Sequence, residues 1–145
     1  AAGSGFQLAL LADIKVSYSK VKMGQVEINS GIVSVIGPWI IEKILGLNKA
    51  IELSLSGRLI NGTEAYKIGA VNHLVPHNSV LKSSVKIAQE LAKKPSNAMK
   101  LTKKRIWEMF SKDFDQTFMK AISYHKKSFK LGEPQSGSKK FFNKK

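Results

Sequence analysis

The spacing of apolar residues predicts that the second half of the chain is helical. Residues 79–94, 96–110 and 113–130 repeat apolar side chains three or four positions apart, which gives a helix one apolar face. The three stripes consist of Leu81, Val85, Ala88 and Leu91; Met99, Thr102, Ile106 and Phe110; and Phe114, Phe118, Ile122, His125 and Phe129. We expect each stripe to lie against another layer of protein.

The first half of the chain mixes short strands with short helices. Apolar–polar alternation and β-branched runs predict strands over residues 14–18, 21–23 and 70–75. An apolar segment that ends at Asp13 predicts a helix over residues 6–12, and segments closed by glycine predict helices over 39–45, 48–56 and 59–68. Asn48 is the predicted N-cap of the third helix, and Gly37 with Pro38 predicts a loop. So few short strands do not make a stable sheet, and we expect this chain to cover a strand layer that lies elsewhere.

Composition excludes several classes of protein. Apolar residues make up 43% of the 145 positions, enough for a core, and cysteine is absent, which excludes disulfides, thiolate metal sites and a cysteine nucleophile. No apolar run approaches the ~20 residues of a membrane span. The N-terminal residues carry no basic leader. We therefore expect a cytoplasmic protein that does not enter a membrane.

Positive charge is concentrated in the second half of the chain. The net charge is +14, of which residues 82–145 contribute +12 and residues 1–81 only +2. Such a surface fits a polyanionic partner or a solvated lysine-rich face, and the charge alone does not decide between them. Only Arg58 and Arg105 are arginines, so the signature for nucleic-acid readout is poor.

The histidines do not predict a metal site. His73 and His77 are separated by Pro76 and do not share a helix face, and His125 belongs to an apolar stripe, where packing is the expected role. Phosphate-binding loops, dinucleotide-binding glycine motifs and serine elbows are absent from the sequence.

Four segments carry a family resemblance. They are GSGFQLALLAD at 3–13, MGQVEINSGI at 23–32, AIELSLSGRLI at 50–60 with EA at 64–65 and IGAVN at 68–72, and Lys94-Pro95 opening a helix before an aromatic and basic end. In this order and spacing they resemble the crotonase family, the enoyl-CoA hydratases and isomerases. The resemblance covers nearly the whole chain.

The resemblance implies an α/β fold, the C-terminal portion of the crotonase ββα spiral. Residues 1–76 would form part of the spiral core with its active-site loops, 77–131 a helical trimerisation region, and 132–145 a loose basic tail. The N-terminal half of the family fold would be a required partner, because it carries most of the sheet and one oxyanion-hole amide. A homotrimer or a dimer of trimers is the implied assembly.

The implied substrate is an acyl-CoA thioester that reacts through an enolate, with coenzyme A as part of the substrate and no separate cofactor or metal. In the Gly3–Gly5 turn the backbone N–H of Ser4 would stabilise the enolate oxygen, and Glu27 would exchange protons. Gly3, Gly5 and Gly31 would contact the substrate. From the residues alone, a simple turn and an exposed loop carboxylate are the favoured interpretations.

Gln7 departs from the family pattern, because hydratases of the family usually have a second glutamate there. An amide has no proton to exchange at neutral pH and can only orient water or substrate. One carboxylate suits double-bond isomerisation better than hydration. A catalytically reduced acyl-CoA-binding or scaffold relative is the alternative, and a basic helical nucleic-acid binder is a weaker one.

The basic C-terminal end has two interpretations. Phe141, Phe142, Lys144 and Lys145 resemble the family segment that reaches the nucleotide end of coenzyme A from a neighbouring subunit. A solvated tail is the alternative. We also predict that this chain alone has little or no activity.

Overall fold

A computed structural model describes residues 1–143, except for the side chains of residues 141 and 142. The helices are α1 (Ser4–Leu11), α2 (Ile36–Leu45), α3 (Leu47–Ser56), α4 (Gly62–Lys67), α5 (Val80–Ala92), α6 (Ser96–Phe110), α7 (Phe114–Leu131) and α8 (Glu133–Phe142). Short 3-10 helices, η1 (Glu27–Ser30) and η2 (His77–Ser79), lie between them. The strands are β1 (Val16–Ser17), β2 (Lys22–Met23), β3 (Ile60–Asn61) and β4 (His73–Leu74).

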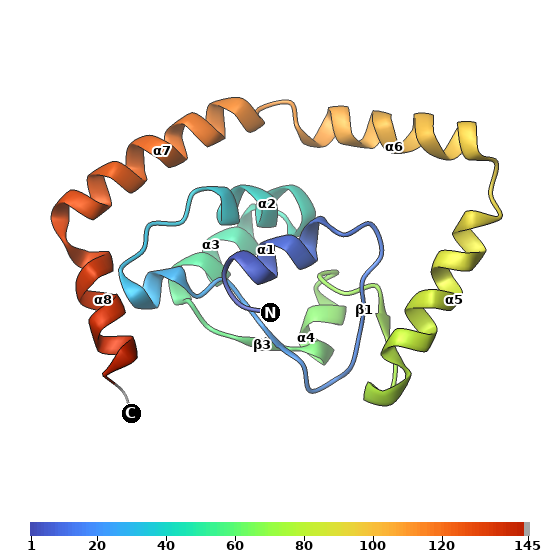
Figure 1. The fold of residues 1–145 in the computed structure, drawn as a ribbon, viewed down its shortest axis with the longest axis horizontal. Coiled ribbons are helices and arrows are strands. Elements are labelled where there is room, and N and C mark those ends of the chain that lie inside the picture. The colour runs from blue at the N-terminus through green and yellow to red at the C-terminus, as the bar shows by residue number, and fades with distance from the viewer. Residues whose placement is uncertain (144–145) are drawn as a thin grey trace.

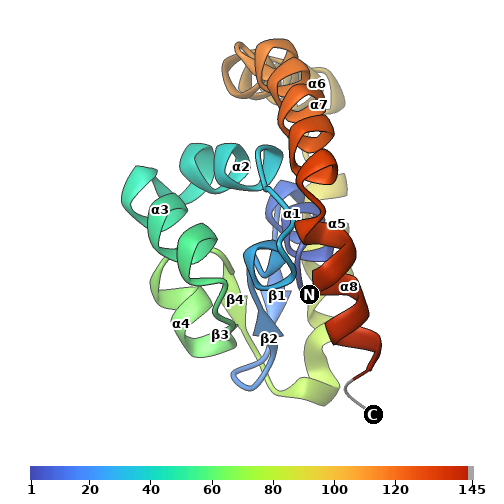
Figure 2. The ribbon, with the colours of Figure 1, turned by 90° about the vertical axis from the view of Figure 1, so that its left-hand side faces the viewer.

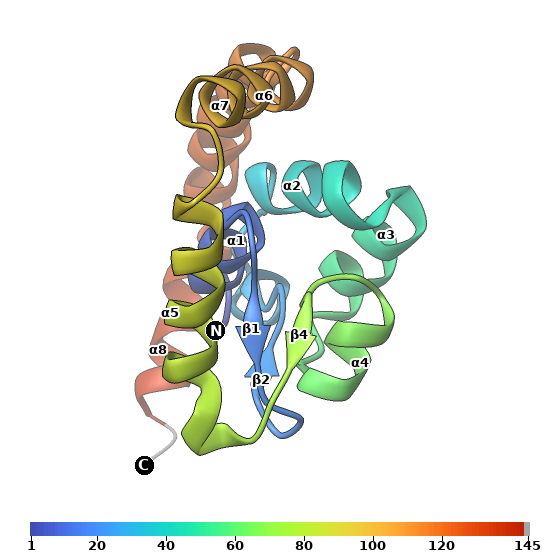
Figure 3. The same ribbon diagram turned by 90° about the vertical axis from the view of Figure 1, so that its right-hand side faces the viewer.

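The strands pair only two by two. β1 runs parallel to β4, with Val16 opposite His73, and β2 runs antiparallel to β3, with Met23 opposite Ile60. Figure 3 shows β1 and β4 side by side, next to α4. The strands are shorter than the sequence predicts, because each has hydrogen bonds to a single neighbour. Within residues 1–143 no sheet has more than two strands.

The core lies among α1, α2, α3 and the β2–β3 pair. Its largest fully buried apolar side chains are Phe6, Leu10, Ile41, Leu53 and Ile60. Two local predictions here are wrong. Gly37 and Pro38 belong to the first turn of α2 rather than to a loop, where the missing N–H of proline costs no helical hydrogen bond. Asn48 does not cap α3, since that helix begins one residue earlier, after Gly46.

Helices α5 to α8 form an arch around this core (Figures 1 and 2). Trp39 of α2 joins the arch to the core, with its ring centroid 4.9 Å from Phe110 and 5.5 Å from Phe114. The indole Nε1 also donates to Asp113 Oδ2 at 3.1 Å. Hydrogen bonds from Lys43 and then from Trp39 hold the pKa of Asp113 below its usual range.

The apolar stripes of the arch are largely uncovered. Within the described chain, neither α5 nor α6 has a buried residue, and α7 buries only Ala121. Leu81 is 76% exposed and Ile106 is 60% exposed. An open apolar cavity of about 810 Å³ lies between α6, α5 and the end of α1, lined among others by Leu10, Leu91, Met99, Ile106 and Phe110. The layer predicted to cover these helices is not supplied by residues 1–143.

The prediction of a loose tail is wrong for residues 133–142, which form α8. Gly132, in the left-handed conformation with φ 79°, ends α7, and Pro134 stands in the first turn of the new helix. Gln135 Nε2 donates to the carbonyl of Phe129 at 3.0 Å. Gly137 packs so closely on η1 that an added Cβ would lie 2.0 Å from the Ser30 carbonyl oxygen. The helix is therefore docked rather than free.

Candidate active site

The glycine-rich turn at the start of α1 is fastened to the segment that follows β2. Gly3 N donates to Gly24 O at 2.9 Å, and Gly24 N donates to Ala1 O at 3.1 Å. Gly3 adopts φ 56° and ψ −126°, a conformation that an L side chain rarely takes. The turn thus carries α1 directly to the residues before η1.

The amide of Ser4 is available for a ligand. The N–H groups of Gly5, Phe6 and Gln7 donate to the carbonyls of Ala2 or Gly3, whereas that of Ser4 donates to no residue among 1–143. Ser4 is exposed and stands at the positive end of α1, where unpaired amides favour negative charge. This position can stabilise an oxyanion.

Glu27 lies against this turn. A Cβ added to Gly3 would be 3.2 Å from Glu27 Oε1, so only glycine leaves room for the carboxylate. Oε1 accepts a hydrogen bond of 2.9 Å from Gln7 Nε2. Oε2 is buried and accepts none from the part of the chain that the structure describes. The structure therefore brings together Gly3, Gln7 and Glu27, beside Ser4, and one carboxylate oxygen of Glu27 has no hydrogen-bond donor among the described residues.

Gln7 acts here as a donor to a carboxylate. The sequence predicts that it orients water or substrate, and the structure adds a direct hydrogen bond to Glu27. The contact joins α1, through Gln7, to Glu27, the first residue of η1. It holds Oε1 of Glu27 in a defined orientation, whereas Oε2 accepts no hydrogen bond from the described residues.

A second connection holds η1 from the opposite side. Asn29 Nδ2 donates to Gly57 O at 2.7 Å, and an added Cβ on Gly24 would lie 2.5 Å from Arg58 O. Gly57 itself has φ 59° and would meet Ile28 if it carried a side chain. The link between α3 and β3 is thus the surface on which the Glu27 segment rests.

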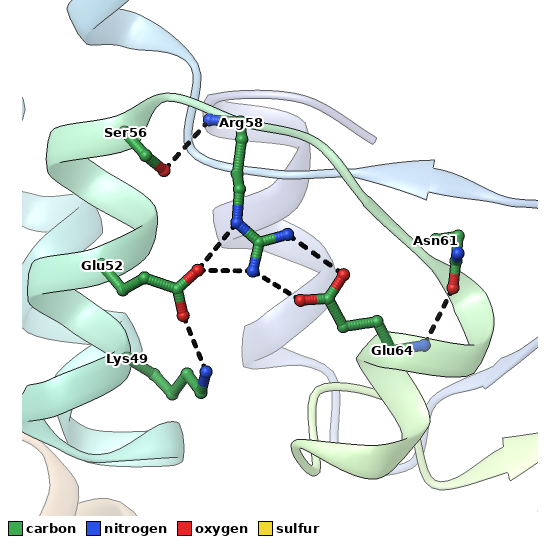
Figure 4. Close-up of polar contacts among 6 residues, drawn as sticks. All are labelled: Lys49, Glu52, Ser56, Arg58, Asn61 and Glu64. Carbon is green, nitrogen blue, oxygen red and sulfur yellow. Dashed lines mark hydrogen bonds and ion pairs between the residues drawn. The ribbon is translucent and has the colours of Figure 1, made fainter.

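Arg58 fixes that link between two carboxylates (Figure 4). Its Nε donates to Glu52 at 2.7 Å and its Nη1 to Glu64 at 3.0 Å, and Nη2 contacts both. Hydrogen bonds from Lys49 and then Arg58 lower the pKa of Glu52, and that from Arg58 lowers the pKa of Glu64. The pair raises the pKa of Arg58 in turn. This network joins α3 to α4 and supports the site without touching it.

Among the other predicted residues, Gly5 lies in the first turn of α1, Gly31 ends η1, and the C-terminal ones fall wholly or in part outside the described residues. Gly5 is exposed with open space beside it, and Gly31, with φ 66°, faces the backbone of Glu133 in α8. The side chains of Phe141 and Phe142 and all of Lys144 and Lys145 lie outside the described residues. The large apolar cavity is lined by neither Gln7 nor Glu27.

Residues 1–143 contain no cluster of three or more histidine, aspartate or glutamate side chains placed to hold a metal ion. Across the same residues, every helix is too short or too polar to cross a bilayer.

The sequence did not single out three polar residues near the site. Gln25, Ser34 and Asn29 join the site by side-chain hydrogen bonds. Gln25 and Asn29 lie in the segment 23–32 that carries the family resemblance, and this was the signal that could have found them. Their burial and partners are not visible in the sequence.

Comparison with known proteins places this geometry in context. The family model described as enoyl-CoA hydratase/isomerase matches residues 1–145. A relative from Thermus thermophilus is 28% identical over 144 residues, which are 99% of this chain and 57% of that relative. A short-chain-enoyl-CoA hydratase of Clostridioides difficile is 34% identical over 103 residues, 70% of this chain and 66% of that protein.

Solved structures show the same fold. A carnitinyl-CoA hydratase from Mycobacterium avium superposes with a TM-score of 0.89 at 21% identity, over 100% of this chain and 57% of that one. The chain therefore has the fold of part of such an enzyme, and it spans about 57% to 66% of the length of these relatives.

Proposed function

The chain belongs to the enoyl-CoA hydratase/isomerase family, and we propose that it supplies the proton-transfer site of an acyl-CoA isomerase. The observation that carries the proposal is the 2.9 Å hydrogen bond from Gln7 to Glu27, which leaves the site with one carboxylate. Hydration uses one group to activate water and another to protonate carbon. Isomerisation needs a single group that takes a proton and returns it.

The proposed reaction moves a double bond in a 3-enoyl-CoA. Glu27 Oε2 takes a proton from the carbon next to the thioester carbonyl, and the released electron pair forms a dienolate whose negative charge lies on the thioester oxygen. The Ser4 amide donates to that oxygen, an interaction whose loss typically costs about 2.7–4 kcal/mol of barrier. Glu27 then returns the proton to the far carbon of the dienolate, giving the 2-enoyl-CoA with no change in oxidation state.

The rest of the substrate site would come from outside this chain. We assign the second oxyanion donor and much of the coenzyme A surface to the part of the family fold that the chain does not span. The uncovered stripes of α5, α6 and α7 support association, and a homotrimer or a dimer of trimers is the proposed assembly. Lysines of the arch and the C-terminal end would attract the three phosphates of coenzyme A, with a strength that falls as salt rises.

Substrate assays test the proposal. The protein, assembled with the remainder of the family fold, is given trans-2 and trans-3 enoyl-CoA thioesters. We expect isomerisation of the trans-3 compound and little addition of water to the trans-2 compound. Hydration at a comparable or higher rate would overturn the argument from Gln7. Tight acyl-CoA binding without turnover would replace the enzyme with a binding or scaffold relative.

A matched pair of variants tests the role of Glu27. Glu27→Gln keeps the size of the side chain and removes the proton acceptor, so turnover should fall by at least ~100-fold, while coenzyme A binding measured by calorimetry stays within about twofold. Glu90→Gln, on the exposed face of α5, is the control and should leave turnover unchanged. Full activity in Glu27→Gln would remove this residue from the mechanism.

A further inference from the structure

Gln25 is a buried polar residue behind the proposed proton-transfer pair. Its side chain is 1% exposed and lies between β2 and η1. Its Nε2 donates to Ser34 Oγ at 2.6 Å, and its Oε1 accepts from Gln7 Nε2 at 3.4 Å. A buried amide without such partners would destabilise the protein, and here both ends of the Gln25 amide have a hydrogen-bond partner.

The hydrogen bonds form a chain with one direction. Gln25 donates to Ser34, Gln7 donates to Gln25, and Gln7 donates its other N–H to Glu27. Rotating the Gln7 amide by half a turn would place its oxygen against the Glu27 carboxylate and against the oxygen of Gln25. The acceptor end of Gln25 therefore selects the orientation in which Gln7 presents N–H to Glu27.

This support matters most in the middle of the reaction. While Glu27 is ionised, its bond from Gln7 is charge-assisted and roughly twice as strong as a neutral one. Once Glu27 has taken a proton, that advantage disappears. The bond to Gln25 does not change with the protonation of Glu27, so it keeps Gln7 in place until the proton is returned.

The absence of a side chain at Gly37 leaves the space that the amide of Gln25 occupies. A Cβ added to Gly37, in the first turn of α2, would lie 2.2 Å from Gln25 Nε2. The amide thus occupies the space that a side chain at position 37 would need. Gly37 and Ser34 together hold the outer end of the chain of hydrogen bonds.

We propose that Gln25 is a positioning residue that orients the amide of Gln7 toward Glu27. The inference rests on the proposed function, in which Glu27 transfers the proton, and the side-chain hydrogen bonds of Gln25 go to Gln7 and Ser34. Gln25 acts through Gln7, and this dependence distinguishes it from a residue that only stabilises the fold.

Activity measurements test the dependence on Gln7. Gln25→Met, of similar length, should lower kcat about tenfold, or ~1.4 kcal/mol of barrier, with KM changed less than about twofold. The double variant of Gln7→Met with Gln25→Met should be no slower than Gln7→Met alone. Multiplied losses in the double variant would mean that Gln25 does not act through Gln7. Gln116→Met, on exposed α7, is the control and should match the parent.

A milder variant and a measurement without substrate complete the test. Ser34→Ala removes only the acceptor of Gln25, so it should lower kcat a few fold. The double variant of Ser34→Ala with Gln7→Met should be no slower than Gln7→Met alone. Hydrogen exchange of the Gln7 side-chain amide, followed by NMR, should be at least about tenfold faster in Gln25→Met than in the parent. Unchanged exchange overturns the inference even in an active protein. Faster exchange in a protein that converts no enoyl-CoA supports the positioning and refutes only the proposed reaction.

Discussion

Substituting Gly137 with alanine should loosen α8, although the same change stabilises an ordinary helix. In an unpacked helix interior, alanine is better than glycine by about 0.5–1 kcal/mol. At Gly137 the new Cβ would lie 2.0 Å from the carbonyl oxygen of Ser30 and 2.5 Å from its carbonyl carbon. Both atoms belong to the backbone of η1, which no side-chain rotation can move away.

The expected cost follows from the distance that must open. Ordinary contact begins near 3.4 Å, so α8 and η1 must separate by about 1.4 Å, the difference from the 2.0 Å approach. Overpacking of this kind typically costs about 1–3 kcal/mol, which exceeds the gain in helix propensity. We expect a net loss of about 1–2 kcal/mol in the docking of α8, a factor of roughly 5–30 in its open fraction.

Amide hydrogen exchange of α8 measures this docking directly, since local opening and global unfolding have different free energies. Exchange in Gly137→Ala should be faster by about the same factor of 5–30. Ser138→Ala, one residue away on the exposed face, is the control and should exchange slightly more slowly, because alanine is the better helix former. Slower exchange in both variants would refute the close approach of α8 to η1.

Two further predictions concern stability. Arg58 lowers the pKa of Glu64 in the folded protein. This carboxylate therefore contributes stability at pH values above its unfolded pKa of about 4.5, and the contribution is lost as the pH falls through its lower folded pKa. Urea unfolding should therefore show a shallower loss of stability between neutral and acid pH in Glu64→Gln than in the parent, and equal slopes would contradict the ion pair. Asn61→Ala removes the side-chain oxygen that accepts from Glu64 N at 2.9 Å and should lower the unfolding free energy by about 1 kcal/mol; an unchanged urea midpoint would show that this cap contributes nothing.

The helices could be predicted because their signals are local. Apolar spacing and terminal glycines place α3 and α7 within one or two residues of their positions in the structure. The tail was less predictable, since its many polar and lysine residues suggest solvation. Its order depends on Gly137 and Gly31, which allow two backbones to approach, and a glycine in a sequence does not show what lies against it.

The sequence suggests residues for the candidate site, but it does not suggest the connections between them. The resemblance identifies Glu27 and Gln7, and the structure places them in contact. The same segment contains Gln25, but nothing periodic links it to Ser34, nine residues later, or to Gln7, eighteen residues earlier. Hydrogen-bond partners of an isolated polar residue depend on tertiary packing, so only coordinates could show the chain.

The contact between Gln7 and Glu27 also explains why an amide and a second carboxylate are not equivalent here. In Gln7→Glu, two carboxyl groups would face each other where a donor and an acceptor now lie 2.9 Å apart. Two such groups cannot both be ionised at that distance, so repulsion raises the pKa of one of them and the pair shares a proton. Turnover that needs an ionised base should then decline at a higher pH in the variant than in the parent as the solution is made more acidic. Coincident pH–rate profiles would show that position 7 does not control the charge of Glu27 during the reaction.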